Sequence, residues 1–214
     1  IITDESSSHN LLQDMKGEYV GHCSSIGFES LTDNASPQDD MGVLIKGTFI
    51  EVNSCEFSNS SGPVINIQGS DNRLINCYIH DGNYIGTYAG HAKISGRRQF
   101  ISNNTICESG RDVLSFRNLS ESVIQYNDIY GAGRLTLDVG VMYSAETDGQ
   151  NTLIHHNYIH DNYTKSNNVG LYPDEMTHNF IIFENVVYNA NTAYQFNQPS
   201  LYNLVYNNTG YNTN

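Results

Sequence analysis

The chain has 214 residues, of which 38% are hydrophobic and 15% charged, and its net charge is −13. Too few residues are charged for a coiled coil, too many are apolar for a disordered chain, and no apolar run approaches the roughly 18 residues that a membrane span needs. The negative charge repels phosphates, so we expect no nucleic-acid partner. Polarity comes instead from uncharged residues, above all 27 asparagines beside 18 glycines and 15 tyrosines.

Residues 1–42 show no clean repeat. The segment Tyr19 to Cys23 has the composition of a short strand, whereas the segment from Leu31 to Gly42 contains Pro37 and several Asp and Asn residues, as is typical of a loop. We therefore expect an N-terminal cap or an irregular first coil in residues 1–42. The chain begins at Ile1 with neither an initiator Met nor a signal peptide, which fits a mature form or a piece of a longer chain.

Residues 43–214 carry one short pattern seven times: an apolar residue, two variable residues, Asn or Cys, one variable residue and an apolar residue. Val52 to Phe57 and Leu74 to Ile79 are its first copies, and the last copy has Gly210 in place of its final apolar residue. The central Asn or Cys occupies positions 55, 77, 104, 127, 157, 185 and 208, at intervals of 22 to 30 residues. Internal repeats of this length are typical of solenoids.

The apolar residues alternate with period two, which predicts short strands and no helix. We expect about three strands in each repeat, the third following a Gly- and Asn-rich loop, as at Val64 to Ile67 and Val113 to Phe116. One such unit cannot bury its own apolar side, but stacked units can. The pattern thus predicts an all-β fold, a parallel β-helix of about seven coils and three parallel sheets, in which residues 43–214 form a single domain with the N-terminal segment.

The recurring Asn has a specific role in such a stack. Equivalent turn residues lie about 4.8 Å apart on successive coils, so their side chains can form a hydrogen-bonded ladder that satisfies polar groups of the turns. Cys55 and Cys77 occupy the same column on successive coils. We expect two buried free thiols there, with a disulfide as the alternative.

These motifs resemble those of the right-handed parallel β-helix proteins of the pectate-lyase-like superfamily over residues 43–214. Many members of that family bind or cleave polysaccharides by lyase, hydrolase or epimerase chemistry, and others are phage tailspikes or adhesins. Gly170 to Glu175 looks like the strand and turn from which an Asp of such enzymes projects into the substrate groove, although Pro173 stands where an apolar branched residue is usual. The resemblance implies a secreted or cell-surface protein whose partner is a polysaccharide or oligosaccharide.

The third strand of each repeat supplies the candidate binding face. With the larger apolar residues placed inward, the outward positions form a polar face that combines tyrosines, which stack on sugar rings, with groups that hydrogen-bond hydroxyls. Its outward pairs are Asn66/Gln68, Gly86/Tyr88, Ser115/Arg117, Met142/Ser144, Tyr172/Asp174 and Gln195/Asn197. Among these and the turns beyond them, the candidate substrate-binding residues are Tyr172, Tyr88, Asn66, Gln68, Ser144, Glu175, His178, Gln195 and Asn197. A solvated sheet face is polar in any case, which is the structural alternative.

Asp174 and Glu146 lie on adjacent coils and are the candidate catalytic pair. We expect their carboxyl groups to lie roughly 5–10 Å apart, the range in which two carboxylates act on a glycosidic bond as acid and nucleophile or as acid and base. Arg117 is the one cation on the predicted face and completes the set of catalytic candidates, as a group that positions substrate in a hydrolase. In a lyase, Arg117 or a Ca²⁺ ion held by turn carboxylates would neutralise a uronate.

The histidines are expected to be structural. Ile79-His80-Asp81 and Ile159-His160-Asp161 are equivalent in the repeat, so each His–Asp pair is predicted to close a turn. The sequence therefore favours a carbohydrate-active protein that cleaves glycosidic bonds, with hydrolysis preferred over lyase chemistry because a chain of charge −13 repels an acidic glycan unless a metal bridges them. No cofactor is required, with Ca²⁺ as an option, and a non-catalytic glycan-binding or adhesin-like module is the remaining alternative.

Overall fold

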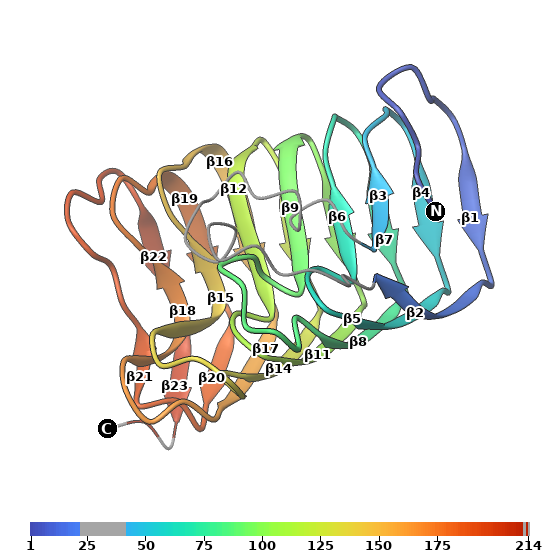
Figure 1. Ribbon diagram of the computed structural model, residues 1–214. Coiled ribbons are helices and arrows are strands. Elements are labelled where there is room, and N and C mark those ends of the chain that lie inside the picture. The colour runs from blue at the N-terminus through green and yellow to red at the C-terminus, as the bar shows by residue number, and fades with distance from the viewer. Residues whose placement is uncertain (22–41, 212, 214) are drawn as a thin grey trace.

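The computed structural model describes residues 1–21, 42–211 and 213, and it is a parallel β-solenoid (Figure 1). Three sheets run along its axis, and in the described residues every strand pairing is parallel and no helix occurs. Each coil contributes one strand to each sheet in the order sheet 1, sheet 2, sheet 3. The all-β fold with three parallel sheets is therefore confirmed. No helix in the described part of the chain is long and apolar enough to cross a membrane.

Sheet 1 consists of β1 (Leu11–Gln13), β4 (Glu51–Asn53), β7 (Arg73–Ile75), β10 (Phe100–Ser102), β13 (Val123–Gln125), β16 (Asp148–His155), β19 (His178–Phe183) and β22 (Leu204–Tyr206). Sheet 2 consists of β2 (Lys16–Gly21), β5 (Glu56–Ser60), β8 (Tyr78–Gly82), β11 (Thr105–Ser109), β14 (Asp128–Ala132), β17 (Tyr158–Asn162), β20 (Val186–Tyr188) and β23 (Thr209–Tyr211). Sheet 3 consists of β3 (Val43–Ile45), β6 (Ile65–Ile67), β9 (Ala92–Arg97), β12 (Leu114–Ser120), β15 (Val139–Ser144), β18 (Asn168–Pro173) and β21 (Thr192–Tyr194).

Within residues 1–42, β1 and β2 pair with β4 and β5 and so extend sheets 1 and 2 by one coil. His22, Cys23 and the loop expected from Leu31 onward lie outside the described residues, apart from Gly42.

The core is built from the inward residues of the repeat. In sheet 1 the inward column contains Leu74, Ile101, Ile124 and Ile154, which pair in register on consecutive strands and are fully buried. Each fully buried side chain of this size contributes about 1.5–3 kcal/mol relative to its exposed state. Because a slip of one residue would turn the whole column outward, this burial fixes the register of the strands.

The Asn ladder lies at the turn between sheets 1 and 2. Asn104 Nδ2 donates to Asn127 Oδ1 at 2.9 Å, and the same arrangement repeats at 3.0 Å from Asn127 to Asn157 and from Asn157 to Asn185. Asn127 Nδ2 also donates to the carbonyl oxygens of Ile101 and Gln125. The ladder thus satisfies backbone groups inside a sharp turn, as expected from the spacing of the repeat.

Cysteine takes the place of Asn at the first two rungs. Cys55 and Cys77 are buried free thiols. The Cys77 sulfur lies 3.2 Å from Ile75 O and 3.6 Å from Val52 O. These carbonyls are equivalent to those of Gln125 and Ile101, which accept hydrogen bonds from Asn127. The thiol therefore replaces the amide as a weak donor, and burial raises its pKa to about 12.

Candidate functional site

The outer face of sheet 3 carries the predicted polar column. Strand pairing places Asn66, Lys93, Ser115, Tyr143 and Tyr172 opposite one another on consecutive strands. Residues paired in this way project to the same side of a sheet, and their neighbours Ile67, Ile94, Leu114 and Leu171 belong to the core. The outward assignment of Asn66, Ser115 and Tyr172 follows directly from this register. Asn66 itself is buried and Gln68 is half-buried.

The expectation for Ser144 is wrong. Ser144 pairs with Phe116 and Met142 pairs with Leu114, so both point into the core, and Ser144 has an exposed fraction of 0%. A substrate on the outer face cannot reach its hydroxyl. The residue that faces outward is Tyr143. Because Tyr143 is large, the sequence pattern places it in the interior. The predicted inward and outward positions of this strand are therefore shifted by one residue.

The assignment of Gly86 and Tyr88 to a strand is also wrong. Both lie in the loop of residues 83–91, and the strand of this coil is β9, with Lys93 on the outer face. Arg117 is therefore not the only cation of the face. Tyr88 remains beside the face, because the Arg111 guanidinium lies over its ring at 4.2 Å. This ring is more than half exposed.

Asp174 is at the centre of a hydrogen-bond network that joins three coils. Its Oδ2 accepts a bond from the Tyr143 hydroxyl at 2.9 Å. Its Oδ1 accepts bonds from Asn197 Nδ2 at 2.7 Å and from the backbone N–H of Glu175 at 2.8 Å. Asn197 Nδ2 also donates to the Tyr172 hydroxyl oxygen at 2.9 Å. These contacts bring Tyr172, Asp174 and Asn197 together, as predicted, and hold the carboxylate in one orientation.

Glu146 lies on the turn after β15 and has a partner of its own. Its Oε2 is 3.4 Å from Arg117 Nη1, and its side chain is largely exposed. The backbone N–H of Glu146 donates to the Glu175 carbonyl at 2.9 Å, so the turns that follow β15 and β18 are stacked. Among the described residues, Asp174 and Glu146 share no hydrogen bond. The structure therefore places Arg117, Glu146 and Asp174 on one face, but as two separate groups.

The remaining candidates lie along the edge of this face. Gln195 Nε2 donates to Asn197 Oδ1 at 3.2 Å and so supports the network from the coil that contains β21. Glu175 is exposed on the turn. His178 begins β19 of sheet 1, beyond the turn, and its Nδ1 accepts a bond from the backbone of Leu201 at 2.9 Å. His178 therefore contacts backbone and not the Asp174 network.

A second arm of the network was not predicted from the sequence. Asn167 Nδ2 is hydrogen-bonded to Asp138 Oδ1 and donates to the Tyr172 hydroxyl oxygen at 3.3 Å. Asp138 is an exposed carboxylate just before β15. Asp138 directly precedes a buried strand and lies one coil before Asp174. This position in the sequence could have identified it as a candidate for the site. The Tyr172 hydroxyl thus lies between one amide that holds Asp138 and another that holds Asp174.

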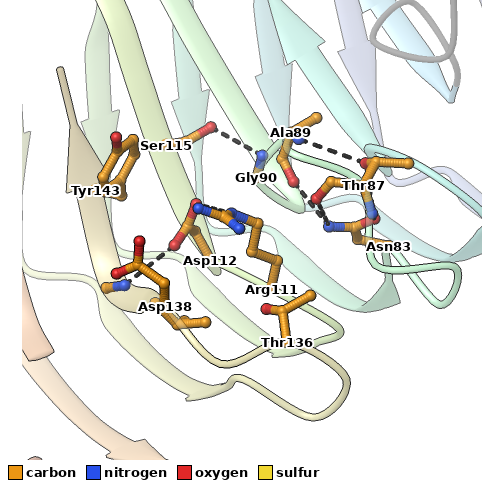
Figure 2. Close-up of polar contacts among 12 residues, drawn as sticks. Asn83, Thr87, Ala89, Gly90, Arg111, Asp112, Ser115, Thr136, Asp138 and Tyr143 are labelled. Carbon is orange, nitrogen blue, oxygen red and sulfur yellow. Dashed lines mark hydrogen bonds and ion pairs between the residues drawn. The ribbon is translucent and has the colours of Figure 1, made fainter. Parts of the chain in front are cut away.

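Asp112 is a further charged residue beneath this face that the sequence pattern does not predict. It is fully buried, its Oδ1 accepts a bond from the Gly140 N–H at 3.1 Å, and its Oδ2 lies 3.3 Å from Arg111 Nε (Figure 2). Burial raises the pKa of Asp112 to about 6, although the Arg111 charge opposes the shift. Figure 2 also shows Asp138 and Tyr143 beside Asp112. This group supports the floor of the face and is not free to touch a substrate.

Tyr143 and Tyr172 form an aromatic pair on the face, with ring centroids 5.4 Å apart and an interplanar angle of 84°. Burial, and then the nearby charge of Asp174, raise the pKa of Tyr143 far above its ordinary value. Burial likewise raises the pKa of Tyr172. Both phenols therefore keep their protons at neutral pH. The Tyr143 hydroxyl donates to Asp174, whereas the Tyr172 hydroxyl oxygen accepts from Asn167 and Asn197.

The carboxylates of this face do not fit a Ca²⁺ ion. Calcium takes six to eight oxygen ligands, but no group of three or more His, Cys, Asp or Glu residues in the described part of the chain is arranged to hold a metal. Both oxygens of Asp174 already accept hydrogen bonds, and Glu146 is paired with Arg117. We therefore derive no step through a metal ion.

Comparisons with known proteins concern the fold. The crystal structure of PfbA, a surface adhesin of Streptococcus pneumoniae, is similar at 11% sequence identity and a TM-score of 0.32, over 99% of this chain and 74% of PfbA. No curated protein matches this chain in sequence. The family model of the right-handed β-helix region matches residues 30–209. Because this match spans most of the chain and the structure is a parallel solenoid, the chain belongs to the right-handed β-helix family.

Proposed function

We propose that the outer face of sheet 3 binds a polysaccharide and hydrolyses its glycosidic bonds, with Asp174 as the central carboxylate. The observation that carries this proposal is the fixed orientation of Asp174 by Tyr143, Asn197 and the Glu175 N–H, next to the half-buried ring of Tyr143 and the buried ring of Tyr172. Preorganised polar groups beside aromatic rings suit a ligand rich in hydroxyl groups. The proposal includes a secreted or cell-surface location.

The charge of the face favours a neutral glycan. Asp174, Asp138, Glu146 and Glu175 project from neighbouring coils, and the chain as a whole carries −13. A uronate polymer would be repelled by this surface. In a lyase, Arg117 or Lys93 would have to neutralise the uronate, and the Arg117 guanidinium is already paired with Glu146. Hydrolysis of a neutral chain therefore agrees better with the charges than β-elimination does.

Hydrolysis requires two carboxyl groups with different roles. Asp174 accepts hydrogen bonds at both oxygens, which fix its orientation, and in this proposal it acts on the anomeric carbon or on a water beside it. The proton donor would be Glu146 or Asp138, two exposed carboxyl groups that flank β15 on the adjacent coil. Glu146 is paired with Arg117, whereas Asp138 is joined to Asp174 through Asn167, Tyr172 and Asn197.

The second candidate function is glycan binding without cleavage. It is favoured by one observation: both oxygens of Asp174 are occupied by protein donors, so that the carboxylate already has a structural role. In this case the face would recognise sugar rings through Tyr172 and its neighbours, and no bond would be broken.

Incubation of the chain with a panel of neutral and uronate-containing polysaccharides tests these alternatives. New reducing ends without ultraviolet absorbance of an unsaturated product indicate hydrolysis, and the same ends with that absorbance indicate a lyase. Retention on an immobilised polysaccharide without new ends indicates a binding module. The proposal expects the first result with a neutral polysaccharide, and neither cleavage nor retention of any member of the panel would contradict it.

A further inference from the structure

A separate hollow lies at the corner between sheets 2 and 3, on the coils nearer the N-terminus. Its volume is about 280 Å³, and its walls include Asp81, Tyr84, Glu108, Arg134 and Leu135 from three consecutive coils. No residue of the Asp174 network lines it. Drug-sized pockets have volumes of about 300–1,000 Å³, so this one suits a small ligand or a single unit of a larger one.

Two glycines on successive coils contribute bare backbone to this hollow. Gly82 and Gly110 line it, and the Gly110 N–H donates to the Gly82 carbonyl at 3.2 Å. A Cβ atom at Gly110 would lie 2.1 Å from the Asn83 carbonyl oxygen, and one at Gly82 would lie 2.0 Å from Nδ1 of the buried His91. Both positions therefore admit only glycine, and each contributes only backbone to the wall of the hollow.

The walls are held in place without a ligand. Asn83 ties the loop that carries Tyr84: its Oδ1 accepts from the backbone N–H and the hydroxyl of Thr87, both at 2.8 Å, and its Nδ2 donates to the carbonyls of Thr87 and Ala89 (Figure 2). On the next coil the Leu135 N–H donates to the Gly110 carbonyl at 2.9 Å. A rigid site of this kind loses little conformational entropy when it binds.

The polar groups of the hollow match a polyhydroxylated ring. Asp81 presents a carboxylate whose Oδ2 is bonded to His80 Nδ1 at 2.7 Å, and Glu108 is ion-paired with Arg134. Carboxylates accept hydrogen bonds from hydroxyl groups, and a guanidinium donates them. The Tyr84 and Leu135 side chains, with exposed fractions of 43% and 59%, offer apolar surface beside these groups. A pyranose combines hydroxyl groups at its edge with an apolar C–H face, which is the same combination.

We propose that this corner hollow binds a single neutral pyranose unit, whose hydroxyl groups bond to Asp81 and Arg134 and whose C–H face packs on Tyr84. The site does not depend on catalysis or binding at the outer face of sheet 3. A polysaccharide held at sheet 3 would be held a second time here through a side branch or a distant unit. A free glycoside would bind here alone.

The test is a titration of the uniformly ¹⁵N-labelled chain with the methyl glycosides of glucose, galactose, mannose and N-acetylglucosamine, followed by two-dimensional NMR. A ligand of this size gives at best millimolar affinity, so the titration extends to about 50 mM. The backbone amide signals of Gly82, Gly110 and Leu135 should shift and saturate with at least one glycoside. The amides of Tyr172 and Asp174 should not follow the same curve.

Two variants locate the ligand, and one serves as the control. Tyr84→Ala and Asp81→Asn should each weaken the binding at least about tenfold. Tyr202→Ala removes a tyrosine that is 82% exposed on the last coil and should leave the affinity unchanged. Unshifted spectra away from the corner verify that the variants fold. Absence of any saturable shift at Gly82 and Gly110, an affinity equal to that of the wild type in both corner variants, or shifts confined to Tyr172 and Asp174 would each overturn the proposal.

Discussion

The Tyr143 hydroxyl donates a 2.9 Å hydrogen bond to Asp174 Oδ2, although strand pairing places Tyr143 opposite Tyr172 and not opposite Asp174. The side chain therefore reaches along the neighbouring strand to the turn beyond it. Burial and the charge of Asp174 keep the phenol protonated by raising its pKa. This contact links the aromatic pair Tyr143 and Tyr172 to Asp174, the carboxylate that is central to the proposed hydrolysis.

Replacement of Asp174 is the first test of that chemistry. Asp174→Asn keeps the size of the side chain but removes its negative charge, so hydrolysis should fall by about 10³-fold or more. Tyr143→Phe removes one donor to the carboxylate and should lower the rate only about tenfold. Reducing-end assays on the polysaccharide that the wild-type chain cleaves give both values. Cleavage that survives in Asp174→Asn would show that the carboxylate is not required.

Glu146 and Asp138 are compared in the same assay. Glu146→Gln and Asp138→Asn change one carboxyl group each on the coil next to Asp174, and Asp138 is the better connected of the two. We expect Asp138→Asn to lower hydrolysis about 10²-fold, the contribution typical of a general acid or base, and Glu146→Gln to lower it less. The opposite order would assign the proton donor to Glu146, as the charge pattern of the sequence suggested.

The Asn ladder predicts a large effect on stability. Asn127→Ala would leave the buried backbone N–H of Asn104 without its 3.0 Å acceptor and would remove one donor each from the Ile101 and Gln125 carbonyls. A buried polar group left unsatisfied costs about 1–3 kcal/mol, so we expect a loss of about 3 kcal/mol in the free energy of unfolding. Urea denaturation followed by circular dichroism measures it.

Asn191→Ala is the matched control for the ladder. Asn191 is exposed, and its side chain takes no part in the ladder. Surface substitutions of this kind change the free energy of unfolding by less than about 0.5 kcal/mol. Equal losses in the two variants would mean that the ladder adds nothing beyond an ordinary surface Asn.

The pattern of the chain predicted the ladder because Asn104, Asn127 and their equivalents repeat at the turn irrespective of loop length. The same pattern gave wrong assignments where the size of a residue or the length of a loop obscured the alternation of the strand. Tyr143 is large and partly apolar, so its outward position could not be read from size, and the loop before β9 is long enough that Tyr88 was mistaken for a strand residue. The burial of Asp112 depends on coils that are distant in sequence. Inward positions marked by the repeat were therefore predictable, whereas the alternation of β15 around Tyr143 and the residues supplied by loops of variable length were not.

Asp112 predicts a dependence of stability on pH. Its pKa in the folded chain is about 6, above the ordinary value of 3.8, because burial disfavours the charge. The folded state therefore binds more protons than the unfolded state between these values, and stability increases as the pH falls. Relative to Asp112→Asn, the wild-type chain should gain about 1 kcal/mol between about pH 7 and about pH 5. Parallel pH profiles of the two proteins would argue against the raised pKa.

His160 also predicts a dependence of stability on pH, but here the folded state favours the charged form of the side chain. Burial lowers its pKa, but hydrogen bonds to Asp128 and Asp161, both at 2.9 Å, outweigh burial and raise it above 6.5. Its stabilising contribution is therefore complete below pH 6.5 and is lost as the pH rises through the folded value. His160→Phe keeps a ring between Tyr130 and Tyr188 but removes both bonds. This variant should be less stable than wild type at about pH 6 and should approach it at about pH 9, as thermal denaturation would measure.

A crystal structure of the Asp174→Asn variant soaked with an oligosaccharide from the polysaccharide that the chain retains or cleaves tests the central claim most directly. Removal of the carboxylate charge should leave binding intact while slowing hydrolysis, so that the ligand survives in the crystal. We predict sugar rings along the outer face of β12, β15 and β18, in contact with Tyr172 and position 174. Sugar bound only on sheet 1 or sheet 2, with the outer face of sheet 3 empty, would contradict the account.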